Sequence, residues 1–236
     1  MRWVCSNAGS SKEHVWPKWI RKHAIEVMGV SPANVQRYEG SQERIGEPPR
    51  RTSSREGHSR LSLTIKHPCE ACNNGWMSRL EAKAAPILTP MIEGGQRWLA
   101  DSDIRILLAW ATKTALNFAY ASEYSYKLPI VPDLAHHLFA GRGDYSPVPN
   151  VLAWVASYEP LGQFAYRHMT AQSYGVHPTT GDHHQVLRAV FVTGHVVFYV
   201  RFAGLGGLSD PRLARSPSAV HAPPRSSGGS QYSLAS

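Results

Sequence analysis

The chain has 236 residues, of which 25 are lysine or arginine and 17 are aspartate or glutamate, so its formal net charge is +8. Apolar residues make up 42% of the sequence, which is enough for a buried core, but no stretch approaches the ~20 consecutive apolar residues of a membrane-spanning helix. The first residues also lack the apolar run of a secretory signal. We therefore expect a cytoplasmic protein without a membrane partner, and the basic charge makes nucleic acid the natural partner.

The first thirty residues predict a short strand or knuckle followed by a helix. Trp16, Ile20, Ala24 and Val27 recur at helical spacing, and Pro17 suits the first helical turn. The opposite face of this helix carries basic side chains that are candidates for contact with a nucleic acid backbone, namely Lys18, Arg21 and Lys22.

Residues 31–60 are polar, rich in proline and glycine, and contain six arginines. This composition predicts a flexible basic loop. Two interpretations of its charge remain open, because the guanidinium groups either follow a DNA backbone in a salt-dependent way or are only solvated. The arginines considered for DNA binding are Arg50, Arg51, Arg55 and Arg60.

A short strand is predicted next, because apolar and polar residues alternate over residues 61–65. The strand leads into Cys69 and Cys72, and a helix follows. We expect Asn73 or Asn74 to cap this helix and Pro86 to end it. Its apolar stripe consists of Trp76, Leu80 and Ala84.

The second half of the chain predicts a long helix and then strands. Residues 101–103 open the helix, and one of its faces is apolar from residue 104 to residue 116. Strand patterns cover residues 151–158 and 164–174, and residues 185–192 and 195–202 form a hairpin with Thr193 and Gly194 as its two-residue turn. From residue 208 onward the composition predicts a disordered tail.

These elements predict an α+β fold in two parts. The first part, residues 1–95, contains the cysteines and the basic loop. The second part, residues 96–207, contains the long helix and the antiparallel hairpin, and its sequence does not reveal a role. The tail at residues 208–236 follows.

Three cysteines cannot all pair in disulfides, and C-x-x-C in a reducing compartment favours a metal or redox use. Cys69 and Cys72, placed between a strand and a helix, can converge on one tetrahedral zinc ion, with Cys5 as the third ligand. The fourth ligand remains open among His67, His14 and water. The other interpretation is three ordinary thiols with no metal.

Glu13 and His14 place a carboxylate beside an imidazole directly before the basic helix. An imidazole with a pKa near neutrality can deprotonate water, and an adjacent carboxylate can hold a divalent cation. The same dipeptide is also common at a solvated helix start, where Ser11 would be the cap.

Together the two stretches are more specific than either is alone. Glu-His-Val-Trp-Pro-x-Trp, starting at Glu13, is followed about fifty residues later by Cys-x-x-Cys-Asn-Asn-Gly-Trp-Met-Ser-x-Leu-Glu, starting at Cys69. This combination resembles the HNH endonuclease family, and in particular HNH-like proteins of phage and bacterial genomes. The resemblance covers about residues 5–90 and implies a small zinc-supported treble-clef (ββα-metal) module.

The resemblance implies metal-dependent hydrolysis of phosphodiester bonds in DNA. His14 matches the general base that activates water, and Glu13 and Asn73 match residues near a catalytic Mg²⁺ or Mn²⁺ ion. Cys5, Cys69 and Cys72 match ligands of the structural zinc. A divalent cation would polarise the phosphoryl group and stabilise the leaving oxygen, while the imidazole supplies the nucleophile.

Two features depart from the family pattern. The first knuckle has Cys5 alone, with Ala8 or Arg2 where a second ligand would stand, and no counterpart of the family's middle asparagine occurs in residues 61–68. A missing orienting residue typically weakens such a site by an order of magnitude or more. The second hypothesis is therefore a zinc-supported nucleic-acid-binding protein that has lost catalysis. The sequence does not indicate a DNA target or an oligomeric state.

Overall fold

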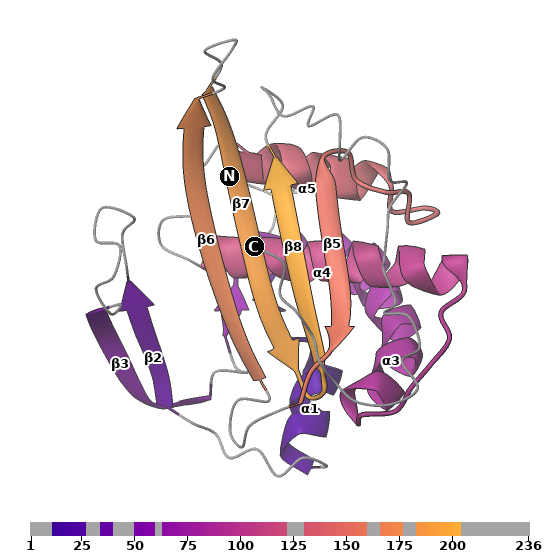
Figure 1. Ribbon diagram of the computed structural model, residues 1–236, viewed down its shortest axis with the longest axis horizontal. Coiled ribbons are helices and arrows are strands. Elements are labelled where there is room, and N and C mark those ends of the chain that lie inside the picture. The colour runs from indigo at the N-terminus through magenta and orange to yellow at the C-terminus, as the bar shows by residue number, and fades with distance from the viewer. Residues whose placement is uncertain are drawn as a thin grey trace, which may run out of the picture.

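The computed structural model describes residues 11–26, 34–39, 50–59, 63–121, 130–159, 166–176 and 183–203. In these ranges helices combine with antiparallel sheets, which confirms the expected α+β class (Figure 1). None of the helices within these ranges is long and apolar enough to cross a membrane. Cys5, Arg60 and the expected tail at residues 208–236 lie outside the described residues.

A four-stranded antiparallel sheet forms one layer of the molecule, with its strands in the order β5-β8-β7-β6. The strands are β5 Val151–Ser157, β6 Tyr166–Val176, β7 His183–Thr193 and β8 Val196–Ala203. Along β8 alternate residues are buried, and the buried ones are Val196, Phe198, Val200 and Phe202. The sheet therefore turns one apolar face toward a helix layer, as strand periodicity requires.

The helix layer consists of α4 Asp101–Ala121 and α5 Ile130–Ala140, which lie behind the sheet in Figure 1. Helix α4 contacts all four strands of the sheet, and α5 packs on α4. Asp101 and Asp103 occupy the first turn of α4, where carboxylates favour the positive end of the helix dipole. The predicted long helix is confirmed, whereas α5 was not anticipated.

Short elements from the first part of the chain cover the other side of α4. They are β1 Glu13–His14, α1 Lys18–Glu26, β4 Thr64–Ile65 and a helical run made of α2 Glu70–Cys72, η3 Asn73–Met77 and α3 Ser78–Ile92. Strands β1 and β4 pair antiparallel, and both α3 and β4 contact α4. The helix predicted after Pro17 is confirmed, with Trp16, Ile20 and Ala24 buried.

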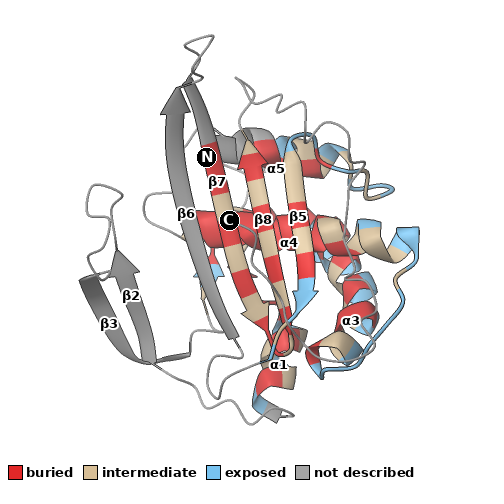
Figure 2. Cartoon of the chain, in the orientation of Figure 1, coloured by how far each residue is buried: buried red, intermediate tan, exposed pale blue. Residues whose placement is uncertain are grey.

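Helix α4 is buried around its whole circumference from residue 109 to residue 120 (Figure 2). Trp16 approaches Phe118 and Phe191 edge-on, with ring centroids 5.1 and 6.1 Å away, so one side chain links the N-terminal segment, α4 and the sheet. A single hydrophobic cluster extends from Val15 to Phe202. The boundary expected near residue 95 therefore does not divide the core.

The helix after the cysteines begins and ends differently from the prediction. Cys69, not Asn73 or Asn74, is its N-cap, because the Cys69 Sγ accepts a hydrogen bond from the backbone N–H of Cys72 at 3.3 Å. Asn73 lies four residues into the turn and donates its backbone N–H to the Cys69 carbonyl at 3.0 Å. The sulfur thus accepts the hydrogen bond that a side-chain oxygen accepts at most helix N-caps.

Pro86 does not end the helix, because α3 continues through Pro86 and Pro90 to Ile92. Pro90 has no N–H to donate to the Pro86 carbonyl, and the Arg97 Nη1 atom donates to that oxygen at 3.1 Å instead. The Thr89 hydroxyl also donates to the Ala85 carbonyl at 2.8 Å. The Arg97 side chain therefore replaces the helix hydrogen bond that Pro90 removes.

The prediction of a loop over residues 31–60 is wrong for two stretches. Strands β2 Asn34–Glu39 and β3 Arg50–Ser59 pair antiparallel and form a ribbon that stands apart from the larger sheet in Figure 1. Their sequences contain few apolar residues, and strand pairing depends on backbone hydrogen bonds that polar residues make equally well. Composition therefore gave no strand signal here.

The turn between β7 and β8 lies one residue later than predicted, at Gly194 and His195, because Thr193 pairs with Val196. Gly194 has a φ of 55°, which glycine adopts without strain. The His195 N–H donates to the Ile92 carbonyl at 3.0 Å, so the turn docks on the end of α3.

Replacing Gly194 tests this docking. A Cβ atom at this position would lie 2.3 Å from the Ile92 carbonyl oxygen, in a backbone region that L residues rarely adopt. We expect Gly194→Ala to lower the free energy of unfolding by roughly 1–3 kcal/mol in urea denaturation. Gly143→Ala is the control, because a Cβ there meets nothing within 4 Å, and a loss in the control equal to that in Gly194→Ala would contradict the docking.

Candidate functional site

Strand β1 places Glu13 and His14 in different surroundings. It pairs with β4 through Glu13 opposite Ile65 and His14 opposite Thr64, and the Val15 N–H donates to the Leu63 carbonyl at 2.9 Å. Neighbouring residues on a strand point to opposite faces. The Glu13 side chain is accordingly buried toward α4, whereas His14 is only half-buried.

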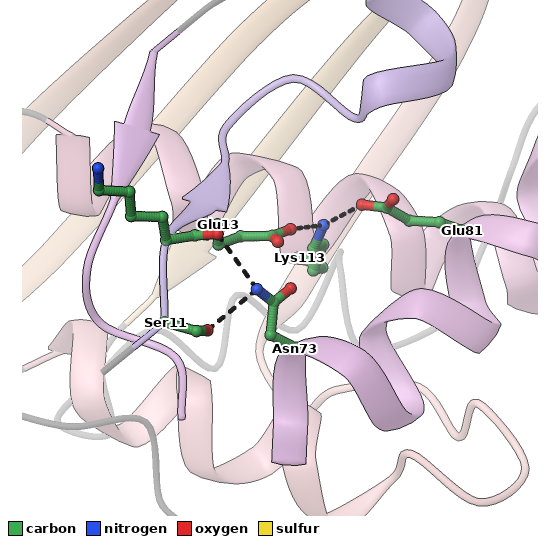
Figure 3. A network of polar contacts seen from close by, with 6 residues as sticks. Ser11, Glu13, Asn73, Glu81 and Lys113 are labelled. Carbon is green, nitrogen blue, oxygen red and sulfur yellow. Dashed lines mark hydrogen bonds and ion pairs between the residues drawn. The ribbon is translucent and has the colours of Figure 1, made fainter. Parts of the chain in front are cut away.

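A buried lysine is the partner of Glu13. Lys113, in the middle of α4, has no exposed surface, and its Nζ lies 2.6 Å from the Oε1 of Glu13. The same ammonium donates a short hydrogen bond to the Oε1 of Glu81 on α3. Figure 3 shows the ammonium between the two carboxylates, which reach it from opposite sides.

Burial and the opposite charges of this cluster together set the pKa values of Lys113 and Glu13. Burial works against the charged form of Lys113, but the Glu81 and Glu13 carboxylates outweigh it and raise the pKa of the ammonium above its ordinary value. Burial also raises the pKa of Glu13, and the Lys113 ammonium opposes that shift. The lysine is therefore a fixed positive charge between two carboxylates.

Asn73 ties the cysteine turn to the segment before β1. Its Nδ2 donates to the Ser11 hydroxyl at 3.0 Å and to the Lys12 carbonyl at 3.3 Å (Figure 3). The Ser11 N–H donates in turn to the Pro68 carbonyl at 3.0 Å. Asn73 and the Glu13-His14 strand, sixty residues apart in the sequence, are thus brought together.

The structure gives the cysteines different states. Cys72 is a free and buried thiol, while Cys69 is disulfide-bonded and thus would need reduction before it could bind zinc as a thiolate. His67, one of the open choices for the fourth ligand, stacks on the Tyr120 ring with centroids 4.3 Å apart. Within the described ranges no three His, Cys, Asp or Glu residues gather into a metal-binding group. Because Cys5 lies outside those ranges, the zinc site stays a prediction.

Cationic side chains of α1 lie near His14. Lys18 and Lys22 are exposed on that helix and Arg21 is half-buried. Burial lowers the pKa of His14, and the Arg21 and Lys18 cations lower it further, while the Glu81 carboxylate raises it. The net shift is downward, which favours the neutral imidazole, the form that can accept a proton.

Three of the other candidate DNA contacts lie on the β2–β3 ribbon. Arg50, Arg51 and Arg55 belong to β3, opposite Glu39, Tyr38 and Val35 of β2. Their backbone positions put three arginines on one ribbon strand, and Arg60 falls outside the described residues.

Sequence reasoning missed the partners of Glu13. Glu81 is the last residue of the stretch that starts at Cys69, and Lys113 interrupts the apolar centre of the long helix. A lysine with Ala109, Trp110 and Leu116 one turn away on its helix is the signal that indicates a buried charge, since an unpaired lysine is rarely fully buried. Its partners could not be read from the sequence.

Comparison of the chain with protein-family models, with curated proteins and with solved structures found no match.

Removing the Lys113 charge tests whether this ammonium compensates the charges of Glu13 and Glu81 inside the protein. We expect Lys113→Met to lower the free energy of unfolding by about 3–5 kcal/mol in urea denaturation, because the buried Glu13 carboxylate and the half-buried Glu81 carboxylate would lose their cation. Asp103→Asn is the matched control, since it breaks an exposed ion pair with Arg97 and should cost less than about 1 kcal/mol. Equal losses in the two variants would contradict the cluster.

The pKa of His14 can be measured by an NMR titration of its imidazole. We expect a value below the ordinary 6.5, and Arg21→Gln should raise it by removing a nearby cation. Because the unfolded chain binds this proton more tightly, the free energy of unfolding should fall as the pH drops below 6.5. Lys83→Gln, which removes a lysine that sits over the Tyr145 ring, is the control, and a His14 pKa at or above 6.5 would contradict the geometry.

Proposed function

We propose that the chain is a metal-dependent DNA endonuclease of the HNH type, with His14 as the general base. The observation that carries this proposal is the assembly around β1. The strand with Glu13 and His14 pairs with β4, which leads into the turn at Cys69 and then into a helix, and Asn73 binds back to the segment before β1. Strand, strand and helix in this order are the parts of a zinc-supported treble clef.

The residues near β1 suit water activation beside a phosphate. The neutral His14 imidazole can take a proton from water, and Arg21 and Lys18 add positive charge for a phosphodiester. When bound, Mg²⁺ or Mn²⁺ would stabilise the charge on the scissile phosphate. The amide oxygen of Asn73 is a suitable ligand for such a cation. Glu13 is the expected second ligand, through the carboxylate oxygen other than the Oε1 that Lys113 binds. With the Cys69 disulfide reduced, zinc at Cys5, Cys69 and Cys72 would fix the turn that carries Asn73.

A second candidate function has its own observation. The Glu13 carboxylate is 8% exposed and paired with Lys113, so a large share of its charge is already neutralised inside the molecule. A carboxylate in that state is a weak ligand for a divalent cation. This favours a zinc-supported protein that binds DNA through α1 and the ribbon of β2 and β3 without cutting it.

A nicking assay separates the two functions. The purified full chain with Mg²⁺ or Mn²⁺ should convert supercoiled plasmid to the open circular form, and His14→Ala should reduce the rate at least about a hundredfold through loss of its general base. The zinc content and the urea midpoint of the variant should stay at the wild-type values. His136→Ala is the control, because His136 is exposed on α5 and should not affect nicking.

Each outcome has a definite meaning. Equal nicking by wild type and His14→Ala would contradict the assignment of the general base. Salt-sensitive DNA binding without nicking under either metal would favour the second function. No DNA binding at low salt would contradict both.

A further inference from the structure

The two stretches that carry the HNH resemblance meet at one side chain outside both of them. Glu13 opens the first stretch and Glu81 closes the second, and the Lys113 ammonium contacts both carboxylates (Figure 3). Lys113 belongs to α4, which the sheet holds from its other side. The cluster therefore connects β1, α3 and α4 at a single point.

The cluster is costly as a source of stability alone. Removing an ammonium and two carboxylates from water carries a large desolvation penalty, and apolar side chains of similar volume often stabilise a core as well or better. The cluster instead restricts the relative positions of the backbone segments. An ammonium that binds two carboxylates through short hydrogen bonds holds the segments that carry those carboxylates at fixed distances from it. Strand β1 has only two residues and two pairs with β4, and the backbone bonds of Ser11 and Val15 extend this short ladder by one bond on each side. The cluster adds a side-chain constraint from α3 and α4 that the ladder does not provide.

We propose that Lys113 and Glu81 are positioning residues of the proposed nuclease site. The ammonium anchors Glu13, and through it the strand that carries His14, to the helix that follows Asn73. His14 and Asn73 then keep one arrangement across the site. This inference rests on the proposed function for its catalytic part, whereas the anchoring of β1 stands independently.

A charge-matched double variant tests the proposal. With all three groups ionised, one lysine and two glutamates give the cluster a net charge of −1. In the double variant Glu81→Gln with Lys113→Met, Glu13 is the one charged group that remains, so the net charge is again −1. We expect its kcat for plasmid nicking to fall roughly 10- to 100-fold, as losses of orienting partners typically do, with little change in KM. Glu81→Gln alone keeps the pair of Lys113 with Glu13 and should lose less.

Hydrogen exchange provides a readout that does not depend on activity. The Val15 amide, which donates to the Leu63 carbonyl, should exchange about tenfold faster in the double variant because β1 opens locally. The Val200 amide in the centre of the sheet should keep its rate, which separates local opening from global unfolding. Asp103→Asn is the control variant for both measurements.

The outcomes distinguish this inference from the proposed function. Faster exchange at Val15 together with a lower kcat supports the positioning role. Unchanged exchange at Val15, or wild-type kcat in spite of faster exchange, overturns it. If the wild-type chain does not nick DNA, the proposed function fails, and the exchange of Val15 alone decides whether Lys113 anchors β1.

Discussion

The ion cluster of Lys113 with Glu13 and Glu81 is the interaction on which the arrangement of the site depends. A lysine without exposed surface must keep a carboxylate partner, because the loss of both carboxylates would leave its charge buried without compensation. Each partner comes from a different segment, so the cluster fixes β1 and α3 relative to α4 more narrowly than apolar packing would. Apolar contacts tolerate small shifts, whereas charge-assisted hydrogen bonds are short and directional.

The cluster depends in turn on the burial of α4. The sheet covers one side of that helix, and β4 and α3 contact it from the first part of the chain, so Lys113 lies in a region that water cannot reach. Trp16, Phe118 and Phe191 join the same layers in the core. The second part of the chain, whose sequence reveals no role, is therefore the support on which the candidate site is built.

The two candidate functions differ in what Glu13 does. In a nuclease, one carboxylate oxygen would serve the catalytic cation while the other stays with Lys113, and His14 on the opposite face of β1 would act on water. In a binding protein, Glu13 would serve only the core, and the cations of α1 would meet the DNA backbone. The lowered pKa of His14 agrees with the first function, and the burial of Glu13 agrees with the second.

The sequence by itself determined the elements whose signal is local. Helical spacing located α1 and α4, alternation located β7 and β8, and the Cys69 motif indicated a strand that leads through a turn into a helix. The tertiary structure alone decided what depends on partners distant in sequence. Arg97 binds the Pro86 carbonyl that Pro90 leaves without a helix donor, backbone pairing turns a polar segment into β2 and β3, and α4 brings Lys113 to Glu13, a hundred residues away. A buried charge is tolerated only where its partners are held, and sequence spacing does not record those partners.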